Sequence, residues 1–367
     1  MSLAAPISAI EVRSTRAAIS VAWSELRQQD LPRWNNILRR TDAPIYQYPF
    51  WNEPYRRMWV TPRYLYWGDE RDPLALVTIL SVGFGPTKIG LVFRGPARIA
   101  PYFPLTRGMF RQLFDWASLN GFMFLRFTHS DPEVLTTIAS AGNAIDSDAF
   151  PYLLDYPVLS EDYIVNQHDS EQETLASFDR EARRKIRRGT EAGYQFHSTD
   201  SPAALQQAWP LFQDCAERKH FRLERPLSFY SDLMRGAQPH NRARLYTASL
   251  DGKVVGSTLV FRDRTTAHCS LAAFDAEHRN SAAFLHWHSM RDMYRLGTSR
   301  YNFGPGPGSL ARFKGEFCPS PVRYPGPLTI VLKEGAFRVW GKAFVPMAKQ
   351  LQPMLRSLAF QRSALSR

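Results

Sequence analysis

The sequence predicts an α/β protein made of two consecutive units of similar plan. Strand-like and helix-like segments alternate over residues 45–142, and the alternation recurs over residues 202–304. The chain has 367 residues, enough for two domains that each bury a core of their own. A composition of 44% hydrophobic and 22% charged residues is typical of a globular protein and argues against a disordered one.

The first unit combines four strands with two helices. The helices are predicted at 106–121 and at 131–142, the second opened by an aspartate cap. Met109, Leu113 and Trp116 share one face of the first helix. The predicted strands are rich in branched and aromatic side chains and comprise residues 63–68, 74–83, 88–93 and 122–129.

The second unit begins with a helix at 170–193, where Ser170 and Glu173 have the spacing of a capping box. Residues 243–274 are predicted as three strands joined by two tight turns, the first an Asp-Gly turn. The other predicted elements are helices at 202–221 and 281–297 and a strand at 299–304.

The segment "YNFGPGPGSLARFKGEF" (301–317) places a stiff, bent loop before Lys314. Pro305 and Pro307 fix their own backbone and lack N–H donors, so they disfavour both a strand and a phosphate-binding nest of amides. We expect the loop to form a shaped wall that a substrate approaches closely, or else a plain connector.

The net charge of +12 favours an anionic partner such as nucleic acid, a phosphorylated substrate or an acidic membrane surface. The helix at 170–193 carries the densest run of basic residues, away from its apolar stripe. A solvated helix face with local pairs such as Glu181–Lys185 is the alternative to anion binding. The candidates for tRNA or phosphate contact are Arg183, Arg184, Lys185, Arg187 and Arg188.

Several other classes of protein are disfavoured. The three cysteines are far apart, which favours a reducing compartment over a disulfide framework or a zinc site. No metal site is expected, because His286 and His288 face different sides of a helix. The first twenty residues lack the apolar run of a signal peptide, and no stretch has the length and apolarity of a membrane span. We therefore expect a cytoplasmic protein.

Four segments, in their order, resemble the FemABX family of peptidyl aminoacyltransferases. They are "LASFDREARRKIRRGTEAGYQF", "DGKVVGSTLVF", "AAFDAEHRNSAAFLHWHSMRDMYRLGTSRYNFGPGPG" and "LARFKGEFCPSPVRYPG", and they span most of residues 170–326. The resemblance implies two tandem GNAT-like (acyl-CoA N-acyltransferase-like) domains with mixed, largely antiparallel sheets. They would occupy residues 1–158 and 159–332, with the reactive cleft in the second and a helical tail at 333–367.

The resemblance also implies an activity, which is transfer of an aminoacyl group from a charged tRNA to an amine, forming an amide bond. The acceptor would be a cell-wall precursor peptide, nucleotide-linked or lipid-linked, or a natural-product amine. Aminoacyl-tRNA would be a co-substrate, and no cofactor is expected. Lys314 would be the catalytic group, stabilising the charge that develops on the ester carbonyl oxygen.

Substrate-binding residues are implied around this lysine. Phe313 either packs against the terminal adenosine or anchors the core, and Tyr301 is placed with it among the substrate-binding residues. The stretch with Arg222, Arg225 and Tyr230 would meet acceptor phosphates, because a guanidinium fork donates to two oxygens at once. From the first domain, Trp51 and Arg56 are expected at the rim of the cleft.

Two other functions stay open. One is an N-acyltransferase that uses acyl-CoA or a carrier thioester, although "EHRNSAAFLHW" (277–287) lacks the glycines that hold pyrophosphate in such a domain. The other is a non-catalytic tandem domain that binds RNA or anionic precursors. The tail, with aromatic and basic residues over 337–360, fits either peripheral membrane contact or two short helices docked on the second domain.

Overall fold

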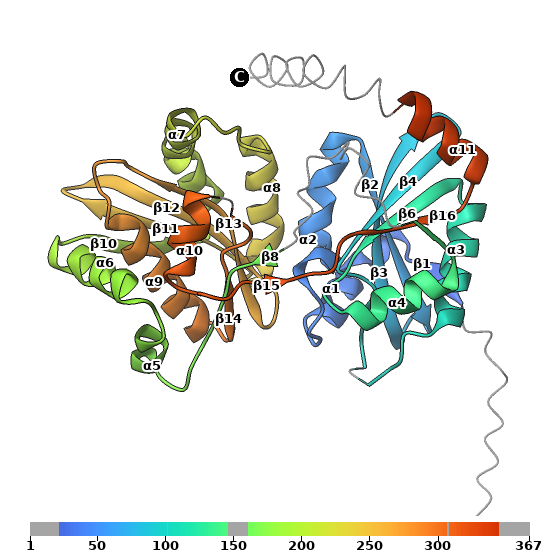
Figure 1. The fold of residues 1–367 in the computed structure, drawn as a ribbon, viewed down its shortest axis with the longest axis horizontal. Helices are drawn as coiled ribbons and strands as arrows, with labels where there is room; N and C mark the ends of the chain where they lie inside the picture. Colours follow the sequence, from blue (N-terminus) through green and yellow to red (C-terminus); the bar gives the residue numbers. More distant parts are fainter. Residues whose placement is uncertain (1–21, 101, 146–160, 307, 345–367) are drawn as a thin grey trace, which may run out of the picture.

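The structure, a computed structural model, describes residues 22–100, 102–145, 161–306 and 308–344. Two α/β lobes lie side by side, each around a mainly antiparallel sheet (Figure 1). The predicted division near residue 158 falls outside the described residues.

The first sheet has strands in the order β1-β2-β3-β4-β6-β16-β7, and β5 pairs with β3. Side chains alternate between its faces: Val77 and Ile79 pack under helices α3 and α4, whereas Leu76 and Leu80 pack toward α1, α2 and the second lobe. The bounds are β1 Trp23–Glu25, β2 Val60–Gly68, β3 Pro73–Phe84, β4 Thr87–Phe93, β5 Ala97–Arg98, β6 Phe122–Thr128, β7 Asn143–Ile145, β16 Leu328–Val331, α1 Leu31–Leu38, α2 Pro49–Asn52, α3 Arg107–Leu119 and α4 Pro132–Ala141.

The second sheet has the order β10-β11-β12-β13-β14-β9, and a short ladder joins β8 to β15. In it, β13 and β14 are parallel and the other neighbours antiparallel. The bounds are β8 Glu161–Asp162, β9 Ile164–Asn166, β10 Gln195–Thr199, β11 Ala243–Leu250, β12 Lys253–Arg262, β13 Thr266–Phe274, β14 Arg300–Asn302, β15 Val322–Arg323, α5 Glu171–Ala176, α6 Arg180–Glu191, α7 Pro202–Arg218, α8 Leu227–Ala237, α9 Ser281–Arg295 and α10 Ser309–Gly315.

The helix predicted at 170–193 is two helices, α5 and α6. Ser170 caps the first by accepting from the amide of Glu173, 3.1 Å away, as the spacing suggested. The side chain of Asp179 then caps α6 by accepting from the amide of Glu181, and it thereby begins a new helix. Phe178 at the break is buried against Trp287 and Phe317, which fixes the angle between the two helices.

The predicted second domain, 159–332, extends too far. Strand β16 leaves the second lobe and lies in the first one (Figure 1). There it pairs with β6 on one side and with β7 on the other. Its Ile330 is fully buried in the first-lobe core. Hydrophobic pattern marks such a segment as a strand but does not say which sheet it joins.

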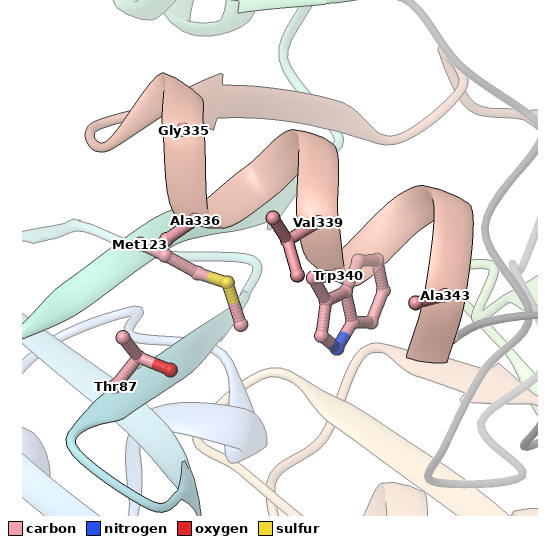
Figure 2. A pocket seen from close by; sticks show the side chains of 7 residues that line it. All are labelled: Thr87, Met123, Gly335, Ala336, Val339, Trp340 and Ala343. Atoms are coloured by element: carbon pink, nitrogen blue, oxygen red, sulfur yellow. The ribbon is translucent and has the colours of Figure 1, made fainter.

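The described part of the tail is also placed differently from the prediction. Helix α11 (Glu334–Val339) and the π-helical turn Trp340–Phe344 pack on the first lobe, where Phe337 and Trp340 contact Phe124 of β6. An apolar groove of about 490 Å³ runs between this helix and β4 and β6, with Met123 and Val339 facing it (Figure 2). Residues 345–367 and the membrane contact predicted for them lie outside the described residues.

One apolar core crosses the boundary between the lobes. It joins Trp34, Tyr48 and Phe50 of the first lobe to Trp209 and Phe212 of the second. Helix α8 lies against α2, and a Cβ on its Gly236 would lie 3.1 Å from that of Phe50. The lobes therefore share one continuous core, which fixes the space between them.

Candidate active site

A cavity of about 210 Å³ opens where the two lobes meet. It is smaller than the roughly 300–1,000 Å³ pockets that hold drug-sized ligands, so it suits a group about the size of an amino acid. Its walls are aromatic and polar and come from both lobes, with Tyr46, Trp51 and Tyr55 facing Arg225, Tyr230 and His268.

The cavity forms where β13 and β14 separate. The two strands pair only at Thr266–His268, after which β13 continues and β14 ends at Asn302. The chain then turns through Gly304, whose φ of 71° is easy only for glycine. Ser270 of β13 is a bulge residue, because Leu259 and Val260 pair with Leu271 and Cys269. Ser270 and Gly304 both line the cavity, so the Gly/Pro loop forms its wall.

Lys314 lies behind that wall, on helix α10. Its Nζ donates to the carbonyl oxygens of Phe303, Gly304 and Pro305 at 2.7, 3.2 and 2.6 Å. These bonds occupy all three protons of an ammonium, so in this arrangement the lysine clamps the loop. Burial lowers the pKa of Lys314, and the nearby Cys269 and Asp162 partly offset this lowering. The positive charge therefore sits next to the cavity wall with its protons directed at the wall itself.

Phe313 and Tyr301 belong to the core beside Lys314. Tyr301 is fully buried, and its hydroxyl lies 3.1 Å from Nδ1 of His286. Phe313 packs on His286 and Phe317. Burial lowers the pKa of His286 to about 3, so this ring is neutral. Phe313 thus packs as the core anchor that was one of its two predicted roles, and Tyr301 lies in the same core beneath the helix that carries the lysine.

Arg225 and Tyr230 line the cavity, whereas Arg222 is exposed and does not. Arg225 is 6% exposed and lies over the rings of Tyr55 and Phe229. Its Nη1 donates to the carbonyl of Glu224, but its buried Nη2 has no hydrogen-bond partner among the described residues. A buried guanidinium nitrogen of this kind is suited to an anionic ligand.

From the first lobe, only one of the two predicted rim residues reaches the cavity. Trp51 lines it and packs edge-on against Tyr46 and Phe261. Arg56 is held by Glu53, with Nε 2.7 Å from the carboxylate, and does not line it.

The basic residues of α6 are largely paired. Arg184 bonds to Glu181, Lys185 to Glu316 at 2.7 Å, and Arg187 lies 3.5 Å from Glu191. Arg183 donates to a backbone carbonyl, and Arg188 is exposed. The helix therefore keeps a basic surface, but much of its charge is compensated locally.

Sequence reasoning missed two polar groups of the cavity. His268 and Asp263 are joined across a tight turn, with Nε2 2.9 Å from a carboxylate oxygen. Asp162 accepts from Arg94 of the first lobe and from Asn302, at 2.7 and 2.8 Å, and so ties the lobes together at the wall. The sequence contains only one indication of the Asp263–His268 pair, namely an aspartate five residues before a histidine near the start of a strand.

The start of α9 is covered by α6. A Cβ on Gly189 would lie 2.7 Å from that of Phe284 and 3.3 Å from the carbonyl oxygen of Asn280. Ser281, the first residue of α9, is fully buried. The pyrophosphate of an acyl-CoA would have to bind the free backbone amides at this N-terminal end of α9, and α6 covers that end.

Within the described residues, no three His, Cys, Asp or Glu side chains gather as a metal site would require. None of the helices in the same part of the chain has both the length and the apolarity to cross a bilayer. Burial raises the pKa of Cys269 to about 11, so this cavity thiol is protonated and a poor nucleophile.

Comparison with known proteins identifies the fold that carries this cavity. Residues 176–315 match the acetyltransferase (GNAT) domain family. No curated protein matches the sequence.

The solved structure of FemX is similar over both lobes, with a TM-score of 0.74 at 14% identity, covering 87% of this chain and 100% of that one. The C-terminal domain of a protein named lysylphosphatidylglycerol synthetase, from Agrobacterium fabrum, gives 0.53 at 16% identity, covering 87% and 96%. A conserved protein of unknown function from Bacteroides thetaiotaomicron gives 0.58 at 12%, covering 85% and 99%. The predicted α/β fold of two tandem GNAT-like domains is confirmed.

Proposed function

We propose that this chain, which has the tandem GNAT acyltransferase fold of FemX, is an aminoacyltransferase that moves an amino acid from aminoacyl-tRNA to an amine. The observation that carries the proposal is the cavity at the separation of β13 and β14, walled by a loop that the partly buried Lys314 clamps. An aminoacyl ester and an amine would meet there.

The chemistry needs stabilisation of negative charge on the ester carbonyl oxygen as the amine attacks. Lys314 would supply it, since an ammonium in a partly buried site acts through a lower effective dielectric than in water. Its bonds to Gly304 and Pro305 hold the charge and the wall in one position. The lysine would thus act both as a fixed charge and as the support of the surface on which the carbonyl rests.

The covered start of α9 favours a tRNA donor over acyl-CoA. Because Gly189 lies against Asn280, a pyrophosphate has little access to the first amides of that helix. Exposed arginines of α6, such as Arg183 and Arg188, offer phosphate contacts on the outside instead.

The acceptor would carry an anionic group as well as its amine. Nη2 of Arg225, which has no hydrogen-bond partner among the described residues, would bind a phosphate or carboxylate inside the cavity, which Tyr230 also lines. A cell-wall precursor peptide has both features, as has a natural-product amine that bears a carboxylate. FemX and the lysylphosphatidylglycerol synthetase domain share the fold and suggest peptide or lipid acceptors.

A transfer assay tests the donor. The protein is incubated with a pool of labelled aminoacyl-tRNAs and a nucleotide-linked muropeptide that has a free side-chain amine, with and without ribonuclease. We expect labelled amide product that disappears when ribonuclease is added first.

Titration with acetyl-CoA in a calorimeter is the companion measurement. Saturable heat together with transfer that survives ribonuclease would replace the tRNA donor with a thioester. Binding of tRNA without any product would leave a binding protein and contradict the enzymatic proposal.

A further inference from the structure

The Asp263–His268 pair has the geometry of a proton-accepting dyad. Oδ2 of Asp263 lies 2.9 Å from Nε2 of His268, while Oδ1 accepts from the amides of Thr265 and Thr266 at 3.0 and 2.8 Å. These bonds fix the carboxylate, which is itself 5% exposed. The carboxylate in turn places the proton of the neutral ring on Nε2, so that Nδ1 is the basic atom.

The basic atom is free to meet a substrate. His268 lines the cavity, and among the described residues no hydrogen bond reaches its Nδ1. The ring is held from the other lobe by Tyr46, whose ring centre is 6.2 Å away and nearly perpendicular. His268 pairs with Asn302 at the last ladder position before β13 and β14 separate. It therefore lies where the cavity begins, on the other side of the wall from Lys314.

A purely structural pair would not need this placement. A histidine that only braced the β12–β13 turn could point at solvent outside the lobes, whereas this one faces the space between them. A buried carboxylate that orients an imidazole toward a ligand space is the arrangement that general bases use.

We propose that His268 is the general base of the reaction, a catalytic residue that takes the proton of the attacking amine, with Asp263 as its positioning residue. The inference rests on the proposed aminoacyl transfer. As the neutral amine forms its C–N bond, its proton passes to Nδ1. When the tetrahedral intermediate breaks its C–O bond, the same proton passes to the leaving ribose oxygen. The products are an amide and a free hydroxyl group, and His268 returns to its neutral form.

Chemical rescue of His268→Ala tests the proposal. General-base catalysis contributes about 10²–10⁴-fold, so the variant should lose that much of the single-turnover transfer rate. Added imidazole, which fits the space of the missing ring, should restore part of the rate in a saturable way. His268→Gln, which can keep a hydrogen bond to Asp263, should be as slow as the alanine variant while the fold is preserved.

His197→Gln is the matched control, because His197 is an exposed residue of the edge strand β10. It should transfer at the wild-type rate and gain nothing from imidazole. Wild-type rates in both His268 variants, or a slow His268→Ala variant that imidazole does not improve, would overturn the dyad and leave the transferase proposal standing.

The donor is decided separately, by running wild type with aminoacyl-tRNA and with acetyl-CoA. If only acetyl-CoA supports transfer, the tRNA proposal fails, and the ratio of His268→Ala to wild type with that donor still decides the role of His268. A wild type that transfers from neither donor overturns both proposals.

Discussion

At the scale of single residues, Arg225 is the side chain best suited to bind a ligand, because its buried Nη2 has no hydrogen-bond partner among the described residues. Leaving a buried charged nitrogen unpaired is costly, and ring contacts with Tyr55 and Phe229 offset only part of that cost. An anionic group of the acceptor would complete its hydrogen bonds.

Arg225→Ala should therefore raise the KM for an anionic acceptor. A hydrogen bond to a charged group contributes about 1.5–3 kcal/mol, which corresponds to a rise of roughly 10–100-fold. Arg222→Ala, the same change three residues earlier on an exposed side chain, should leave KM near the wild-type value. Steady-state kinetics with the nucleotide-linked acceptor gives both constants, and equal effects in the two variants would contradict the assignment.

For single residues, the structure can be compared with the predicted positions of the side chains, whereas their predicted roles stay predictions. The place of Lys314 next to the Gly/Pro loop followed from spacing, but its three bonds to the loop depend on how α10 folds back. Trp51, Arg225 and Tyr230 do line the cavity, while Arg56 and Arg222 do not. The difference lies in which way a loop side chain points, and no periodicity reports that.

At the scale of elements, the contact between α6 and α9 decides what can reach the start of α9. The two helices can approach this closely because residue 189 is a glycine. A side chain at that position would clash with the Cβ of Phe284, which is attached directly to its backbone and cannot move aside. The capping residues Ser170 and Glu173 correctly predicted the start of α5. The break between α5 and α6 at Asp179 was not predicted, because the pattern of basic and apolar residues continues through it.

Gly189→Ala should destabilise the protein by about 1–3 kcal/mol through overpacking. Gly335→Ala is the matched helical control, with no atom of the described residues within 4 Å of the added Cβ. It should be neutral or slightly stabilising, by up to about 1 kcal/mol, because alanine favours helix. Urea unfolding of both variants measures this, and an unchanged midpoint for Gly189→Ala would show that the helices are not in close contact.

At the scale of the molecule, a shared apolar core and a returning strand join the two lobes. One core cluster crosses the boundary, and β16, which follows the second lobe in the sequence, completes the first sheet. The tandem plan could be predicted because each repeat has its own local pattern. The return of β16 could not, because pairing of distant strands leaves no local signature.

The protein should consequently unfold in one cooperative transition, since a large apolar interface couples its domains. Ile330→Ala, on β16, should lower the stability by about 2–5 kcal/mol and shift that transition as a whole. Tryptophan fluorescence and circular dichroism should give coincident midpoints. Two separate transitions, of which the mutation moves only one, would contradict the coupling.

The most direct measurement is single-turnover transfer by Lys314→Met, which keeps an apolar stem and removes the charge. We expect the rate to fall by about 10²–10³-fold, the loss typical of removing one group that stabilises an oxyanion. Arg312→Met, an exposed cation on the same helix, should remain as fast as wild type. A Lys314→Met protein that is folded and transfers at the wild-type rate would contradict the account.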